Sequence, residues 1–187
     1  FTIMDIAKEL FMPLTVGGGI RTTKDIEMVL KMGADKVAIN SEIFRNSFLI
    51  EEAVQEFGQQ CITVSIDIKK DNNTYKIYSH THRELLDLCL LDFCKKVEQL
   101  GAGELLINNV SRDGLMEGPD TVLISLISSL VSIPVIAAGG ISAPSDCTQV
   151  IEAGALAVAA ASIFHFTSYT PNECKASMEA SGIPVRL

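Results

Sequence analysis

One carboxylate in the sequence is placed where it could act as an acid or a base. Asp67 directly follows the run 62–66, which has the composition of a strand. Catalytic groups of α/β barrels collect at the carboxyl ends of strands, and a carboxylate there can exchange protons if its surroundings tune its pKa. Position alone leaves a structural alternative open, in which Asp67 caps a helix or pairs with Lys69 or Lys70.

A second polar cluster follows another predicted strand. The segment 108–114 reads Asn-Asn-Val-Ser-Arg-Asp-Gly and is rich in short polar side chains. It could present backbone amides and the Asp113 carboxylate to a substrate. It could equally be a tight turn, for which Asp-Gly is common.

One segment occurs twice, and its glycines indicate anion binding. The segment 14–41 consists of an apolar run, glycines, a helical stretch, Gly-Ala and a second apolar run, in that order. The segment 135–162 repeats this order. Three pairs lie 121 positions apart: Gly18 and Gly139, Gly33 and Gly154, and Ser41 and Ser162. Backbone N–H groups at strand ends and helix starts bind phosphate without cationic side chains. The repeat therefore predicts two phosphate sites on one scaffold.

Other polar residues have less specific positions. Lys36 and Glu104 begin their predicted strands, so they would lie at the opposite end of a barrel from Asp67, unless they are merely solvated strand ends. We expect His80, His82 and His165 to be surface or packing residues, because none has a partner at metal-ligand spacing.

Composition argues against several classes of function. The net charge is −8, so the chain lacks the excess of basic residues that is typical of a general nucleic-acid-binding protein. Five scattered cysteines without a CxxC pair are typical of reduced thiols in a cytosol and make a metal site unexpected. The most apolar stretch, 122–141, is interrupted by serines, Pro134 and two glycines, so neither a membrane span nor a signal peptide is predicted. We expect a cytoplasmic protein.

The elements that must position these residues alternate along the chain. Predicted strands cover 14–16, 36–39, 61–66, 104–108, 135–138 and 157–160. Predicted helices cover 47–57, 85–100, 121–130 and 145–153, with one more capped by Thr22 or Thr23, and 69–83 forms a hairpin. Alternation of this kind predicts an α/β fold with parallel strands. An open doubly wound sheet is the alternative, but the repeat and the polar strand ends favour a barrel.

Several motifs in order resemble the cyclase subunit of imidazole glycerol phosphate synthase. They are Val-Gly-Gly-Gly-Ile at 16–20, Gly-Ala-Asp-Lys-Val at 33–37, Ser-Ile-Asp-Ile-Lys at 65–69, Gly-Ala-Gly-Glu at 101–104, Arg-Asp-Gly at 112–114 and Ser-Ile-Phe-His-Phe at 162–166. The resemblance covers essentially the whole chain. It implies a TIM (β/α)8 barrel with a two-fold internal repeat, here one partial domain over 1–187 with about six βα units and without the N-terminal two.

The resemblance also implies an activity. The family is a lyase of histidine biosynthesis that needs no cofactor. It joins ammonia from a glutaminase partner to a substrate with a phosphate at each end. The products are imidazole glycerol phosphate and an aminoimidazole carboxamide ribotide.

The resemblance assigns roles residue by residue. Asp67 would be a catalytic aspartate, and Lys36 and Glu104 would belong to a gate at the ammonia entry. Gly19, Asn40 and Ser41 would hold one phosphate, Asp113, Gly114, Gly140, Ala161 and Ser162 would bind the other, and Asn108 and Ala138 would face the substrate.

The sequence also departs from the family pattern. Asn108, Ala138 and Ser111 replace a Thr, a Ser and an Asp, and the region that carries the second catalytic aspartate is absent. These replacements resemble paralogues that support sugar amidation in surface-glycan biosynthesis. A third possibility is a non-catalytic fragment that serves as a phosphate-binding or assembly module. We expect the 187 residues alone not to form a closed, active barrel but to show an open six-stranded array, a gap filled by another chain, or poor solubility.

Overall fold

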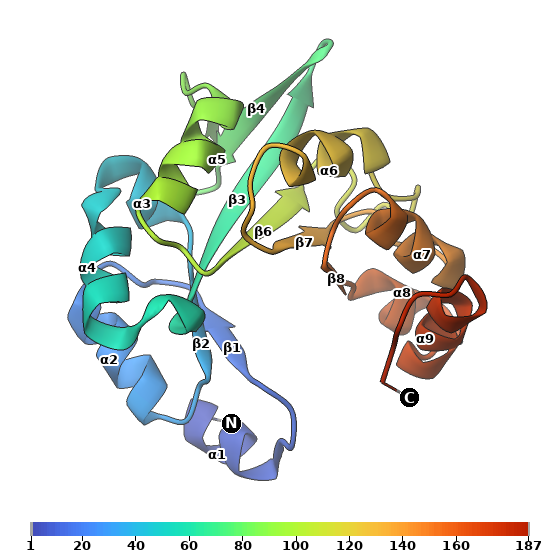
Figure 1. Ribbon diagram of the computed structural model, residues 1–187, viewed down its shortest axis with the longest axis horizontal. Helices are drawn as coiled ribbons and strands as arrows, with labels where there is room; N and C mark the ends of the chain where they lie inside the picture. The colour runs from blue at the N-terminus through green and yellow to red at the C-terminus, as the bar shows by residue number, and fades with distance from the viewer. Residues whose placement is uncertain (1, 187) are drawn as a thin grey trace.

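The computed structural model describes residues 2–186, which fold around one curled parallel sheet (Figure 1). Within these residues, six parallel strands are hydrogen-bonded in the order β1-β2-β3-β6-β7-β8. They are β1 (Thr15–Gly17), β2 (Lys36–Ile39), β3 (Ile62–Asp71), β6 (Glu104–Asn109), β7 (Val135–Ala138) and β8 (Ala157–Ala159). The α/β class and the six predicted strands are confirmed, with small differences at the strand ends.

Helices cover the convex face of the sheet. They are α1 (Ile3–Glu9), α2 (Thr23–Lys31), α3 (Ser41–Arg45), α4 (Phe48–Phe57), α5 (Leu90–Gln99), α6 (Thr121–Ser128), α7 (Pro144–Glu152), α8 (Ser162–Phe166) and α9 (Pro171–Ala180), with a short 3₁₀ turn, η1, at Gln59–Cys61. The predicted cap of α2 is Thr22, whose Oγ1 accepts a hydrogen bond from the Asp25 amide at 3.3 Å. None of the helices in the described part of the chain is long and apolar enough to cross a bilayer.

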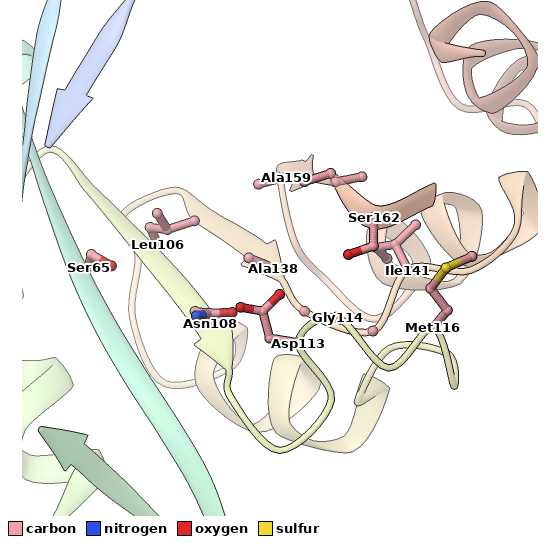
Figure 2. Close-up of a pocket in the computed structure, with 14 residues that line it drawn as sticks. Ser65, Leu106, Asn108, Asp113, Gly114, Met116, Ala138, Ile141, Ala159 and Ser162 are labelled. Carbon is pink, nitrogen blue, oxygen red and sulfur yellow. The ribbon is translucent and has the colours of Figure 1, made fainter. Parts of the chain in front are cut away.

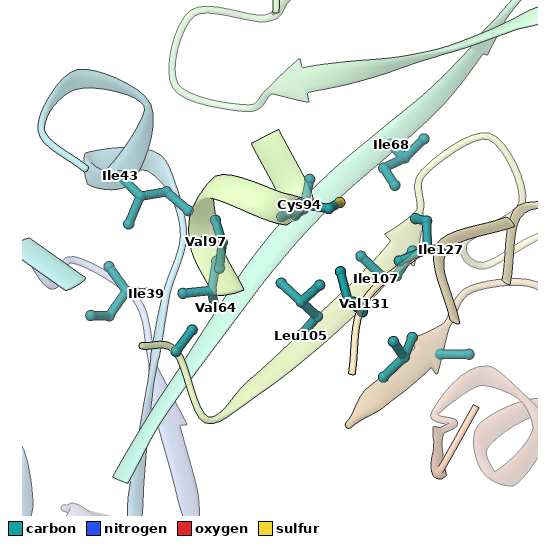
Figure 3. Packing of buried hydrophobic residues seen from close by; sticks show 14 of the residues in the cluster. Ile39, Ile43, Val64, Ile68, Cys94, Val97, Leu105, Ile107, Ile127 and Val131 are labelled. Carbon is teal, nitrogen blue, oxygen red and sulfur yellow. The ribbon is translucent and has the colours of Figure 1, made fainter. Parts of the chain in front are cut away.

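The two faces of the sheet differ because side chains alternate along a strand. In β3, Val64, Ile66 and Ile68 are completely buried against helices. Figure 3 shows two of them, Val64 and Ile68, with side chains of β6, α5 and α6. The residues between them, Ser65 and Asp67, point to the concave face. That face therefore carries the polar side chains that could do chemistry.

Strand β3 does not end where the sequence pattern predicted. It continues past Ile66 to Asp71 because β4 (Thr74–Ser79) pairs with its second half in antiparallel orientation. The predicted hairpin is confirmed, and a short strand, β5 (Glu84–Leu85), extends it. Residue 85 therefore belongs to the hairpin, and the helix that we predicted over 85–100 begins at Leu90.

The sheet is curled but not closed. Among residues 2–186, β1 pairs only with β2 and β8 pairs only with β7, so each edge has one hydrogen-bonded neighbour. Figure 1 shows the two edges facing an open side of the molecule. Of the expected outcomes, the open array of six parallel strands is the one seen in residues 2–186. The concave face, which would be the interior of a complete barrel, is accessible here.

Candidate active site

Asp67 is a buried carboxylate on the concave face, held by two amide side chains. Only 6% of its surface is exposed. Its Oδ2 accepts a hydrogen bond from Asn40 Nδ2 at 2.7 Å, and its Oδ1 accepts one from Asn108 Nδ2 at 2.9 Å. Asn108 is brought into place by the register of the sheet, which aligns it with Asp67 on the neighbouring strand. Two amide donors stabilise an ionised carboxylate and fix its orientation.

The structural alternatives for Asp67 are wrong. Lys69 and Lys70 make no ion pair with it; their ammonium groups lie 5.2 Å and 5.8 Å from the ring centroids of Tyr78 and Tyr75. Asp67 also caps no helix, because β3 continues beyond it. Neither of the two structural roles that its position allowed is therefore found for Asp67.

The turn between β4 and β5 lies beside Asp67, which the sequence did not suggest. His80, expected to be a surface or packing residue, is largely exposed, yet its Nε2 lies 3.7 Å from Asp67 Oδ2. Thr81 Oγ1 donates a hydrogen bond to Ser41 Oγ at 3.1 Å. Sequence reasoning missed both residues, because antiparallel pairing of the hairpin brings them to the parallel strands. The only available signal was the histidine itself, in a turn that returns to the strand of Asp67.

A cavity of about 280 Å³ opens next to this carboxylate, at the carboxyl ends of β6, β7 and β8 (Figure 2). Residues predicted from the sequence line it: Asn108, Asp113, Gly114, Ala138, Gly140, Ala161 and Ser162. Ser65, Leu106, Met116, Gly139, Ile141, Ala159 and Ala160 complete the lining. The structure thus brings together the whole set that was assigned to the second phosphate and to the substrate-facing positions.

Gly140 is required by the packing of this cavity. Its φ of +89° is a conformation that residues with side chains rarely adopt, and a Cβ added to it would lie 2.3 Å from the Gly118 carbonyl oxygen. The Gly118 amide donates to the Gly140 carbonyl at 2.9 Å, so the two backbones are in direct contact. The close approach leaves no room for a side chain.

The loop that closes one side of the cavity, residues 110–118, is anchored at its base. Arg112 Nη1 donates to the carbonyls of Gly118 and Pro119 at 2.8 Å and 3.1 Å. Asp120, which caps α6 through the Leu123 amide, accepts hydrogen bonds from the Asn109 amide and from the Tyr75 hydroxyl. Arg112 is thereby engaged with the backbone, and the hairpin is tied to the loop through Tyr75.

Replacing Tyr75 by Phe should destabilise the protein by about 1–2 kcal/mol, because the Asp120 carboxylate loses a hydrogen bond from its hydroxyl. Burial, together with Asp120, raises the pKa of Tyr75 from its ordinary value of 10 to about 12. The hydroxyl therefore stabilises the fold below pH 10, and this contribution is lost as the pH rises through about 12. Urea unfolding of both proteins at pH 8 and pH 11 checks this. A stability difference that grows with pH would contradict it.

The residues assigned to the first phosphate lie apart from the cavity. Gly19, Asn40 and Ser41 do not line it. Gly19 follows β1, and Asn40 and Ser41 follow β2, which lies beside β3. All four strands of the repeat are parallel, so both predicted sites are at the same edge of the sheet. The side-chain amide of Asn40 is engaged by Asp67, which leaves the Ser41 hydroxyl and backbone N–H groups for an anion.

Lys36 and Glu104 meet at the other end of the concave face. Lys36 Nζ forms an ion pair with Glu104 Oε1, and Thr63 Oγ1 donates to Glu104 Oε2 at 3.0 Å. Both side chains are more than two-thirds shielded from solvent, so the reading as freely solvated strand ends is wrong. Glu104 precedes Asn108 by four residues, which separates the pair from the Asp67 site by roughly 13 Å along the strand.

Comparison with known proteins decides the family. The profile of the histidine biosynthesis protein family matches residues 2–170. This chain belongs to that family. A Vibrio vulnificus protein, provisionally named imidazole glycerol phosphate synthase subunit hisF2, is 46% identical over 97% of the chain and 67% of its own length.

Two further relatives have the same level of similarity. The imidazole glycerol phosphate synthase subunit HisF of Dehalococcoides mccartyi is 42% identical over 97% of the chain and 72% of its own length. A Campylobacter jejuni protein, provisionally named subunit hisF2 of the same enzyme, is 42% identical over the whole chain and 74% of its own length. The curled parallel sheet agrees with the barrel architecture expected from the resemblance.

Proposed function

We propose that this chain provides the cyclase activity of imidazole glycerol phosphate synthase, a lyase reaction of histidine biosynthesis in the cytoplasm. Ammonia would be joined to a substrate with a phosphate at each end, giving imidazole glycerol phosphate and an aminoimidazole carboxamide ribotide. The observation that carries the proposal is Asp67, a buried carboxylate oriented by two amides beside a polar cavity. Family membership and the name of the Dehalococcoides relative support the same activity.

Asp67 would move protons during addition of ammonia and closure of the ring. Its two oxygens are fixed by Asn40 and Asn108, with one amide donor on each oxygen. The fixed orientation removes the need to reorganise at the moment of proton transfer.

The two ends of the substrate would be held by the two halves of the repeat. The cavity at Gly140, Ala161 and Ser162, with Asp113 and Gly114 across it, would take one phosphate, and Gly19, Asn40 and Ser41 would take the other. Asn108 and Ala138 would face the substrate between them. The elements after the two glycine runs support a common design, because α7 starts and ends 121 positions after α2. Backbone N–H donors would let an acidic chain bind a doubly anionic ligand.

Asp67 also favours an enzyme over a passive phosphate-binding module. A module that only assembles or binds phosphate needs no buried carboxylate on its concave face, whereas a cyclase does. The direct test is turnover by the full-length protein with ammonium as the nitrogen donor. Formation of imidazole glycerol phosphate supports the proposal, and binding of substrate without turnover would indicate the module.

A second candidate function is support of sugar amidation in surface-glycan biosynthesis. The observation that favours it is Asn108, which stands where the cyclase family usually has Thr and is hydrogen-bonded to Asp67. This replacement alters the immediate surroundings of the reacting group. A full-length protein that delivers ammonia to a sugar amidotransferase but leaves the histidine-pathway substrate unchanged would establish this alternative.

The ion pair at the far end of the concave face would gate ammonia supplied by a glutaminase partner. Lys36, Glu104 and Thr63 form a connected group at the amino ends of the strands, where a partner could dock without blocking the cavity. Neutral ammonia can pass a satisfied ion pair. A carboxylate without its cation would instead retain ammonium.

We expect the Lys36→Met substitution to lower glutamine-dependent turnover of the complex by about tenfold, the effect of roughly 1.4 kcal/mol. Turnover with externally added ammonium should change little, because the Asp67 site is untouched. Lys31→Met is the matched control, since Lys31 is an exposed surface residue that pairs with Glu27 on α2. Equal loss with both nitrogen donors would argue against a gate.

A further inference from the structure

The structure assigns a second proton-carrying group to the Asp67 site: we propose that His80 acts with Asp67 as an acid–base pair on the substrate. This inference rests on the proposed function. His80 comes from the β4–β5 turn, at residues 80–83, and its Nε2 lies 3.7 Å from Asp67 Oδ2. Histidine is the side chain best suited to carry a proton near neutral pH.

The turn that carries His80 is fixed from both sides. The His82 amide donates to the buried Ser79 Oγ at 3.2 Å, which closes the turn. The Thr81 hydroxyl donates to Ser41, at the start of α3. Tyr78 holds the imidazole through an edge-on contact, with ring centroids 5.0 Å apart and planes at 86°. His80 is therefore directed toward Asp67 by its own strand and by the neighbouring helix.

The accessibility of the pair suits reaction chemistry rather than structural support. Asp67 is buried, whereas the His80 side chain is 58% exposed. The separation of 3.7 Å is slightly longer than a hydrogen bond, and catalytic contacts of this kind often tighten only with substrate bound. One member of the pair therefore remains accessible to solvent.

The pair regains its starting protonation state after each addition of ammonia. In the active form Asp67 is ionised and His80 is an imidazolium that directs Nε2–H toward it. Asp67 takes a proton from the nitrogen that ammonia contributed, and His80 gives its Nε2 proton to the oxygen of the carbonyl under attack. The pair is then a neutral carboxylic acid and a neutral imidazole. Return of the proton from Asp67 Oδ2 to His80 Nε2 restores the starting form without an external acid or base.

The imidazole lies beside Asp67 of β3 and the ring of Tyr78 on β4. On α3, the neutral Ser41 hydroxyl is bonded to Thr81, the residue after His80. The ammonium group of Lys69 lies 5.2 Å from the Tyr78 ring centroid. A change in the pH profile on replacing His80 can therefore be assigned to His80 and Asp67, provided that the Tyr78→Phe variant keeps the normal profile.

The experiment uses the full-length protein, ammonium as nitrogen donor and the histidine-pathway substrate. We expect His80→Asn to lower kcat about 100-fold, the lower end of general acid–base contributions, with KM within a few-fold. The descending basic limb of the pH–kcat profile should also disappear. His82→Asn is the control, because His82 lies in the same turn and uses only its backbone amide there. A normal kcat and pH profile in His80→Asn would overturn the inference.

A second measurement separates failure of this inference from failure of the proposed function. In the ligand-free protein at pH 7, the Asp67→Asn substitution should move the ¹⁵N resonance of the His80 ring and leave that of His82 in place. An unchanged His80 resonance would refute the pairing whatever the substrate is. If Asp67→Asn does move the His80 resonance but the wild-type protein does not convert the histidine-pathway substrate, the pairing stands and the substrate assignment is refuted.

Discussion

Replacing Asp67 by Asn is expected to lower ammonia-dependent turnover of the full-length protein by about 10³-fold, with substrate KM within a few-fold. The reason is that an amide cannot accept a proton, while its size and shape match the carboxylate. A factor of 10³ corresponds to about 4 kcal/mol in the activation free energy and lies within the range measured for general acid–base groups. Steady-state kinetics with saturating ammonium checks the expectation.

The fold should tolerate this substitution. Asn40 and Asn108 both donate to Asp67 through Nδ2, and an Asn at position 67 offers only one oxygen. Rotation of the Asn108 side-chain amide would present its oxygen to the new NH₂ group and restore the second hydrogen bond. Asp71→Asn is the matched control, because Asp71 lies on the same strand near the hairpin turn. Retained turnover in Asp67→Asn would remove Asp67 from the mechanism.

The Gly140→Ala substitution is expected to destabilise the protein by roughly 3 kcal/mol and to raise the substrate KM at least tenfold. About 1–2 kcal/mol comes from a non-glycine residue with positive φ, and the rest from displacing the Gly118 backbone, which would lie 2.3 Å from the new Cβ. Because Gly118 ends the loop that closes the cavity, the displacement should alter the second phosphate site as well. Urea unfolding and initial-rate kinetics measure the two effects.

Gly182→Ala provides the comparison for the backbone term alone. Gly182 has a φ of +78°, and an added Cβ would meet nothing within 4 Å. This variant should lose only about 1–2 kcal/mol and keep a normal KM. If Gly140→Ala and Gly182→Ala are equally destabilised and both keep the normal KM, the contact between Gly140 and Gly118 does not shape the cavity.

Local patterns were sufficient to predict the elements and much of the site. The alternation of apolar runs and helical stretches identified all six parallel strands of residues 2–186. This was possible because a buried element shows its apolar pattern within a few neighbouring residues of the sequence. The two glycine runs and the segment 108–114 placed polar groups at strand ends. In parallel strands those ends lie at one edge, so the set around Gly140 and Ser162 converges on one cavity.

Tertiary structure alone decided the partners of each side chain. That Asn40 and Asn108 hold Asp67, and that Lys36 pairs with Glu104, depends on the register of strands β2, β3 and β6. Register is set by packing between segments far apart in the chain, and no local periodicity records it. For the same reason β3 was predicted to end at Ile66, since its second half is extended by pairing with β4.

The position of His80 shows this division most clearly. The sequence by itself determined that a hairpin follows Asp67, through the turn signal at 71–73 and the alternation after it. It also determined that a histidine lies where the hairpin ends. Only the tertiary structure shows that this histidine lies beside Asp67 and that its neighbour Thr81 is hydrogen-bonded to Ser41. The physical reason is that hairpin formation is local, whereas the direction in which a hairpin folds over a sheet is set by the twist and packing of the whole layer.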